Sequence, residues 1–178
     1  MNGEEDVETP TDDETGTDSE ASGYRTDFAD GLDSWTVGLH PNADQRVTIG
    51  DGEWKERHGG SVHLHVRGGP NHVGVYRTFN GLKEGMIIRA RYESSNLRGE
   101  PGGPRILLHT PDGESTQLDR DSGGGGDSSP DTDGLLEGTV PRDFPDGTDV
   151  EVRLGVWPGE IDVYVTQIIL PDEGVVPS

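Results

Sequence analysis

Apolar residues that recur at every second position constrain the fold of this chain more than any other feature of its sequence. In Val150–Val156, for example, each second side chain is aliphatic, and the residues between are acidic, basic or glycine. Because successive side chains of a β-strand point to opposite faces, this spacing predicts strands with one buried and one exposed face. No stretch of ten or more residues has the spacing of a helix.

Glycine, proline, asparagine and aspartate separate these alternating runs, as expected for turns between short strands. Short strands at this spacing predict an all-β protein, folded as a sandwich of two antiparallel sheets. Trp35 lies among apolar residues and is expected to pack in the core. The expected strands are Trp35–Leu39, Arg46–Ile49, Ser61–Arg67, His72–Phe79, Met86–Ser94, Arg105–His109, Leu135–Val140, Val150–Val156 and Ile161–Leu170.

The first 30 residues differ from the rest, because they contain 11 acidic side chains and one basic side chain. Their few apolar side chains bury too little surface to offset the entropy lost on ordering. The expected organisation is a disordered acidic tether at residues 1–25, a β-sandwich domain at 26–173 and a C-terminal tail at 174–178. Residues 119–134, mostly glycine, serine and aspartate, are expected to form a flexible loop.

The 178-residue chain has 35 acidic and 14 basic side chains, and its net charge is −21. Of the basic residues, 12 are arginine and 2 are lysine. Abundant Asp and Glu with scarce lysine resembles the composition of proteins from salt-loving archaea. Salt at about 1 M shortens the Debye length to about 3 Å, which screens repulsion between carboxylates. A halophilic protein is therefore expected, with an ordinary acidic bacterial protein as the alternative.

The composition also argues against several kinds of partner. Nucleic acid is not expected, because no basic run is present to neutralise phosphates. No apolar run approaches the roughly 18 residues of a membrane-spanning helix, and no signal peptide is visible. The absence of cysteine excludes disulfides and thiolate metal sites.

The start of the sequence, Met1–Gly3 followed by residues rich in Asp, Glu and Thr, resembles the tether that follows the lipidated cysteine of haloarchaeal lipoproteins. We therefore expect an extracellular or cell-surface protein. A lipid anchor on a removed N-terminal segment is one form that this location would take. We expect the domain to be a monomer.

Four segments together resemble jelly-roll carbohydrate-binding modules of the galactose-binding-like type. They are "DFADGLDSWTV" at 27–37, "GGSVHLHV" at 59–66, "VYRTFNGLKEGMIIRARYES" at 75–94 and "IDVYVTQIILPD" at 161–172. The first has an acidic-glycine turn before a tryptophan, and the last looks like the final strand of such modules. The resemblance covers nearly the whole body of the chain. It implies a jelly-roll β-sandwich that binds glycan chains without catalysis.

The same resemblance implies a structural calcium ion, held in many such modules by the acidic turn of the first strand and an aspartate near the last one. Asp30 matches the first position. Thr166 stands where the second aspartate is expected, which weakens a cage of oxygen ligands. Calcium bound through Asp30 is the one cofactor expectation.

Aromatic and basic side chains are the candidate glycan contacts, because a sugar ring stacks on an exposed aromatic ring while its polar groups need hydrogen-bond partners. Guanidinium groups also suit uronate or sulfate groups. The alternative is a solvated face where the arginines pair with carboxylates such as Glu93 and Glu151. The candidate ligand-binding residues, expected to line one concave sheet face, are Trp54, Trp157, His63, His65, Arg67, Tyr76, Arg89 and Arg91.

His63 and His65 also have the i, i+2 spacing that puts two imidazoles on one strand face. With a third ligand from His109, His72 or Glu93 they would suit zinc. Exposed histidines on a polar sheet face are the alternative.

The sequence therefore favours non-catalytic glycan binding outside the cell. It contains no Gly-x-Ser-x-Gly motif, and paired carboxylates carry no information in so acidic a chain. Two alternatives remain open. One is a structural or adhesive surface domain that binds protein, favoured by a salt-bridged face without aromatic rings. The other is a small polysaccharide lyase or glycoside hydrolase, favoured by a convergent His-Arg-Tyr or two-carboxylate cleft.

Overall fold

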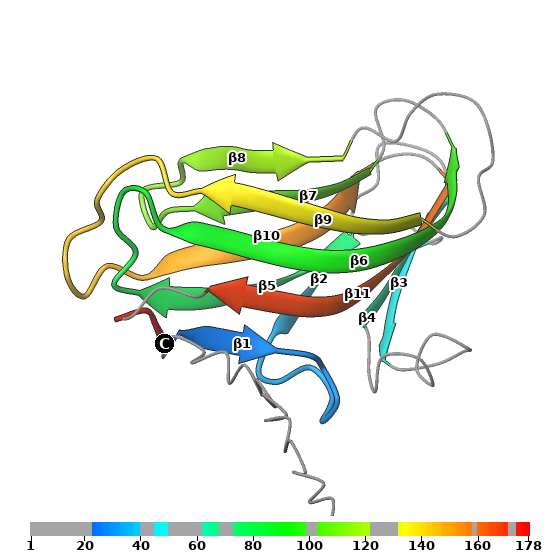
Figure 1. Ribbon diagram of the computed structural model, residues 1–178, viewed down its shortest axis with the longest axis horizontal. Coiled ribbons are helices and arrows are strands. Elements are labelled where there is room, and N and C mark those ends of the chain that lie inside the picture. Colours follow the sequence, from blue (N-terminus) through cyan, green and yellow to red (C-terminus); the bar gives the residue numbers. More distant parts are fainter. Residues whose placement is uncertain are drawn as a thin grey trace, which may run out of the picture.

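Within the part of the chain that it describes, the computed structural model consists of twelve β-strands joined by turns and loops, without helices (Figure 1). No helix in this part is therefore long and apolar enough to cross a membrane. The described residues are 23–39, 45–49, 62–67, 73–98, 103–121, 132–157, 160–170 and 174–178.

The strands form two sheets in which every pairing is antiparallel. Sheet A has the order β3-β4-β11-β6-β9, and β1 pairs with β11 on the same edge as β4. Its strands are β1 (Tyr24–Thr26), β3 (Gln45–Ile49), β4 (Val62–Arg67), β6 (Ile87–Arg98), β9 (Thr132–Thr139) and β11 (Glu160–Leu170).

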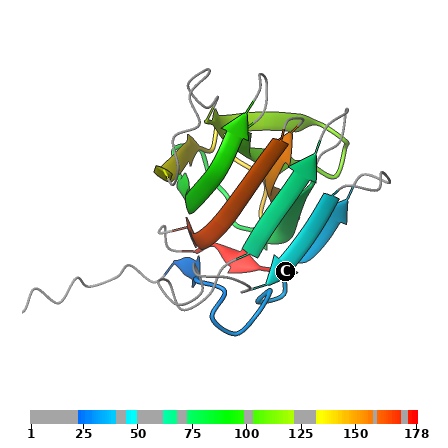
Figure 2. The same ribbon diagram turned by 90° about the vertical axis from the view of Figure 1, so that its right-hand side faces the viewer.

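Sheet B has the order β12-β5-β10-β7-β8. β2 also pairs with β5, on the same edge as β12 but at the opposite end of the strand. The two sheets lie against each other as layers, with β6, β9 and β11 in front of β5, β7 and β10 in Figure 1 and turned by 90° in Figure 2. The strands of sheet B are β2 (Thr36–Leu39), β5 (Val73–Asn80), β7 (Gly103–His109), β8 (Ser115–Arg120), β10 (Val150–Trp157) and β12 (Val176–Pro177).

Buried apolar side chains from both sheets form one core. Val152 and Leu154 of β10 meet it from sheet B, and Ile88 of β6 and Val163 of β11 meet it from sheet A. Burial at every second position of β7, and of β5 apart from the partly buried Arg77, confirms that the two-residue alternation is real. The all-β, two-sheet antiparallel sandwich predicted from the sequence is therefore confirmed, and Trp35 is in the core as expected.

The ordered strands extend beyond the expected boundaries at both ends. β1 begins at Tyr24, inside the expected tether, and the Tyr24 ring packs edge-on against Phe79 with the ring centroids 5.0 Å apart. β12 lies inside the expected C-terminal tail and pairs with the end of β5. Residues 1–22, the rest of the expected tether, lie outside the described residues.

β8 was not among the expected strands, and it includes the first two residues of the expected loop at 119–134. Its side chains are mostly polar because it is the edge strand of sheet B, and a bulge beside Leu107 interrupts its pairing with β7. The end of the same loop, from Thr132, belongs to β9.

Tyr92 of β6 links the two sheets through its hydroxyl group. The side chain is buried on the core face, and the hydroxyl donates a hydrogen bond to the carboxylate of Asp121, directly after β8. Burial, with the hydrogen bond and negative charge of Asp121, raises the pKa of Tyr92.

We expect Tyr92→Phe to lower the free energy of unfolding at pH 7 by about 1–2 kcal/mol, because the hydrogen bond from the Tyr92 hydroxyl to the Asp121 carboxylate is lost. Since the pKa of Tyr92 is raised on folding, the stabilisation is complete below the unfolded pKa of about 10 and is lost as pH rises beyond it. Urea unfolding of both proteins from pH 7 to 11 should therefore show a difference that shrinks above pH 10. A difference that is absent at pH 7, or constant with pH, would contradict this role.

Candidate functional site

The structure divides the candidate ligand-binding residues between the two sheets. Sheet A holds the candidates in β4 and β6, and sheet B holds those in β5 and β10. Trp54 lies outside the described residues. For His63, His65, Arg67 and Trp157 the structure gives the place of the residue in its strand. The sheet A group is His63, His65, Arg67, Arg89 and Arg91, and the sheet B group is Tyr76 and Trp157.

On the outer face of sheet A, the face turned away from sheet B, Arg89 forms an ion pair. Its Nε lies 2.7 Å from Oε2 of Glu137, the residue opposite it on β9, and both side chains are partly exposed. Arg91 is exposed and lies opposite Leu135, whose side chain is also exposed. Arg89 thus follows the pattern of an arginine paired with a carboxylate, an arrangement that adds little stability at a surface.

The expected zinc ligands are separated in the same way. His63 and His65 are in β4 of sheet A, whereas His109 is in β7 of sheet B, with Nδ1 2.7 Å from the Ser115 hydroxyl oxygen. Glu93 is in sheet A, but β11 lies between it and β4. Among the residues that the structure describes, no three histidine, aspartate or glutamate side chains are placed to hold one metal ion.

The outer face of sheet B, turned away from sheet A, contains a strip without side chains. Gly38 of β2 lies opposite Gly74 of β5, which lies opposite Gly155 of β10. We call these three residues the glycine strip. A Cβ atom on Gly74 would lie 2.5 Å from the carbonyl oxygen of Leu154, so only glycine fits at that position.

An aromatic ring borders the glycine strip. Tyr76 of β5 is half-buried, and two of its ring carbons would lie 3.5 and 3.6 Å from a Cβ on Gly38. Arg153, opposite Tyr76 on β10, has its guanidinium carbon 5.5 Å from the ring centroid. Arg153 also donates to the carboxylate of Glu151 on the same strand face. Trp157 lies two residues beyond Gly155 along β10.

Two arginines continue the line of the glycine strip toward the edge of the sheet. Arg105 of β7 lies opposite Gly155, and Arg120 of β8 lies opposite Arg105. Nη1 of Arg105 donates to Oε1 of Gln117 at 3.4 Å. Burial and the positive charge of Arg120 lower the pKa of Arg105.

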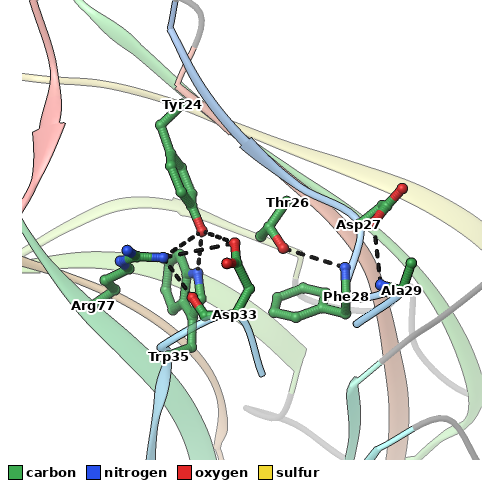
Figure 3. A network of polar contacts seen from close by, with 8 residues as sticks. All are labelled: Tyr24, Thr26, Asp27, Phe28, Ala29, Asp33, Trp35 and Arg77. Carbon is green, nitrogen blue, oxygen red and sulfur yellow. Dashed lines mark hydrogen bonds and ion pairs between the residues drawn. The ribbon is translucent and has the colours of Figure 1, made fainter. Parts of the chain in front are cut away.

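A second polar cluster surrounds Arg77, which occupies a core-facing position of β5 between Val75 and Phe79 (Figure 3). Its side chain is only 15% exposed. The Tyr24 hydroxyl accepts hydrogen bonds from Arg77 Nη1 at 3.0 Å and Trp35 Nε1 at 2.9 Å, and donates to Asp33 Oδ2 at 2.7 Å. Burial, followed by the bond to Asp33, raises the pKa of Tyr24.

Arg77 also holds the turn that precedes β2. Its Nη1 donates to the carbonyl oxygen of Asp33 and lies 3.6 Å from Oδ2 of the same residue. Asp33 and Ser34 have left-handed φ angles of 45° and 62°, and so does buried Phe28 with 57°. Such angles are costly for residues other than glycine, and the contacts of Arg77 and the core offset this cost.

The expected calcium site does not fit this turn. Asp27, Asp30 and Asp33 line a cavity of about 300 Å³, but Arg25 lines it too. Asp27 Oδ1 accepts a hydrogen bond from the Ala29 amide at 3.1 Å. Asp33 Oδ2 accepts a hydrogen bond from the Tyr24 hydroxyl and forms an ion pair with Arg77. Asp30, the residue that the resemblance assigned to calcium, is exposed. The guanidinium of Arg77 already brings positive charge to Asp33.

We expect Arg77→Met to lower the free energy of unfolding by about 2–3 kcal/mol, because the Asp33 carbonyl loses the Arg77 donor and the partly buried Tyr24 hydroxyl loses one of its two donors. Arg89→Met on the outer face of sheet A is the matched control and should cost less than about 1 kcal/mol. Chemical unfolding measures both, and a calcium chelator should leave the wild-type protein unchanged. Equal effects of the two variants would refute this role for Arg77.

Three features of these sites were not predicted from the sequence: Arg77, the glycine strip and the Arg105–Arg120 pair. A core-facing position of Arg77 could have been predicted, because Arg77 follows the same two-residue alternation as Val73, Val75 and Phe79. The other two depend on strand register, which places residues from different strands side by side.

No protein-family model matches the sequence, and no curated protein is significantly similar to it. Solved structures are similar in fold. A xylan-binding domain of carbohydrate-binding family 22 has a TM-score of 0.56 and 18% identity, with 89% of this chain and 99% of that chain covered. A mannan-recognising module of family 27 has a TM-score of 0.50 and 17% identity, with 83% and 94% covered.

The enzymatically active domain of tailspike protein 4 from bacteriophage CBA120 is also similar, with a TM-score of 0.50 and 14% identity. The match covers 85% of this chain but only 20% of the tailspike chain. At these identities the similarities show the fold alone. The chain is a jelly-roll β-sandwich of the kind found in carbohydrate-binding modules, and the fold that the sequence resemblance implied is confirmed.

Proposed function

We propose that this domain binds a polysaccharide or glycan without catalysis, on the outer face of sheet B. The observation that carries this proposal is the glycine strip bordered by the Tyr76 ring. Adjacent strands are about 4.8 Å apart, so three glycines in register span about 10 Å. Gly38 and Gly74 are partly exposed, and Gly155 is buried. A sugar ring can lie over this strip and stack its apolar face on tyrosine.

Polar side chains beside the strip suit the hydroxyl groups of a sugar. Arg153 and Glu151 lie on the same face as Tyr76, and Thr36 lies opposite Tyr76 on β2. The named specificities of similar folds, xylan and mannan, support a polysaccharide ligand. In this proposal Tyr76 and Trp157 belong to the site, whereas the sheet A group of His63, His65, Arg67, Arg89 and Arg91 does not.

A protein-binding adhesive domain is less well supported, because an aromatic ring borders the strip on this face. A lyase would need histidine, arginine and tyrosine to converge. His109 shares the face with Tyr76 and Arg153, but β10 separates its strand from β5, a spacing of about 10 Å. A hydrolase would need two carboxylates, and Glu151 is held by Arg153.

We expect pull-down with insoluble xylan or mannan in molar salt to retain the wild-type protein, and Tyr76→Ala and Trp157→Ala to reduce retention. Loss of one stacking ring should weaken binding about tenfold, equivalent to about 1.4 kcal/mol. Tyr164→Ala, on β11 of sheet A, is the matched tyrosine control and should bind normally. Retention that survives Tyr76→Ala but is lost with Tyr164→Ala would move the site to sheet A.

Gly38→Ala gives a second test that fills the strip without removing a side chain. A Cβ on Gly38 makes only ordinary contacts, at 3.5 Å or more, so the variant should fold normally. We expect weaker retention on the same polysaccharides and an unchanged circular dichroism spectrum. A folded variant that binds like the wild type would show that the strip is not the site.

We also propose that the domain works in high salt, outside the cell or on its surface. The net charge of −21 and the 12:2 ratio of arginine to lysine support this setting. Screening of carboxylate repulsion should raise the unfolding temperature steadily from about 0.1 M to about 1 M NaCl, as the Debye length falls from about 10 Å to about 3 Å. Calorimetry measures this change, and replacing exposed Asp30 and Glu84 with amides should reduce it. An unfolding temperature that is insensitive to NaCl would contradict the proposal.

A further inference from the structure

The line of residues across the outer face of sheet B has a neutral end and a cationic end. From β2 to β8, strand register places the glycine strip first, then Arg105, then Arg120. A chain molecule lying over the strip along this line would therefore meet two guanidinium groups next. Strand register thus places the two arginines in line with the proposed glycan site.

The two arginines oppose each other directly. Like charges at opposite positions of neighbouring strands destabilise a sheet, and the pKa of Arg105, lowered by burial and by the charge of Arg120, reflects this repulsion. An anion between the two groups would offset the repulsion. Two guanidinium groups are also suited to it, because each offers paired N–H donors to a carboxylate or sulfate.

The carboxylates next to Arg120 in the sequence have structural roles. Asp119 Oδ2 accepts the backbone amide of Glu137 in β9 at 2.8 Å, and Asp121 accepts the hydroxyl of Tyr92. Both contacts join β8 to sheet A. Variants of Asp119 or Asp121 would therefore disturb the sandwich.

From this arrangement we infer that the glycan is anionic, and that one of its carboxylate or sulfate groups binds between Arg105 and Arg120 while a neighbouring sugar lies over the glycine strip. The inference rests on the proposed glycan binding and adds the chemical class of the ligand. Close charge-assisted hydrogen bonds persist in molar salt, where long-range repulsion from the acidic chain is screened.

Calorimetric titration of the full chain in molar NaCl tests this inference with three probes. They are a xylo-oligosaccharide, an oligogalacturonide that carries carboxylates, and a sulfated chondroitin oligosaccharide. We expect at least one acidic probe to bind about tenfold more tightly than the neutral probe, and the better one identifies the anion. Arg105→Gln and Arg120→Gln should each weaken that probe about tenfold and leave the neutral probe within about twofold, as one charge-assisted contact is lost.

Arg89→Gln on sheet A is the control and should leave the binding of all three probes unchanged. Competition on the wild-type protein covers the case in which an arginine variant does not fold: sodium sulfate should displace the acidic probe more than NaCl of equal ionic strength. Neutral and acidic probes that bind equally, or acidic binding insensitive to both the arginine variants and sulfate, would overturn the inference while glycan binding stands. Failure of all three probes and of xylan and mannan would instead refute the proposed function.

Discussion

Aliphatic side chains of sheet A and sheet B face each other across one core, and a slip of one residue in any strand would exchange its buried and exposed faces. This requirement fixes the outer surface as well as the core. Tyr76 points outward because Val75 must be buried, and Arg153 does so because it lies between Val152 and Leu154. The proposed site is thus determined by the packing of the sandwich behind it.

Two polar groups occupy core-facing positions without breaking this packing. Arg77 and Tyr92 each lie on the buried alternation of a strand, and each extends a polar end to partners at the margin of the sandwich. Arg77 fixes the turn before β2, and Tyr92 joins β6 to the end of β8 through Asp121. The acidic residues near these groups therefore stabilise the fold, in addition to any role in hydration at high salt.

Most of the fold was predictable from the sequence, because alternation marks long strands such as β5 and β10 and turn residues separate them. The short strands β1 and β12 were missed because two or three residues are too few to show a two-residue alternation. β8 was missed because it is a polar edge strand with a bulge. The site was predictable only in part. Tyr76 was expected as a ligand contact, but no sequence pattern shows that Gly38, Gly74 and Gly155 are neighbours, since pairing between distant strands places them together.

The most direct test of a glycan site on sheet B is a nuclear magnetic resonance titration of the labelled protein with the tightest-binding oligosaccharide. Backbone amide signals report the face on which the ligand lies, without any substitution. The account predicts that the largest shifts belong to the glycine strip, Tyr76 and Arg105, with little change at Arg89 and Leu135 on the opposite face. Large shifts confined to sheet A, or no shifts at saturating ligand, would contradict it.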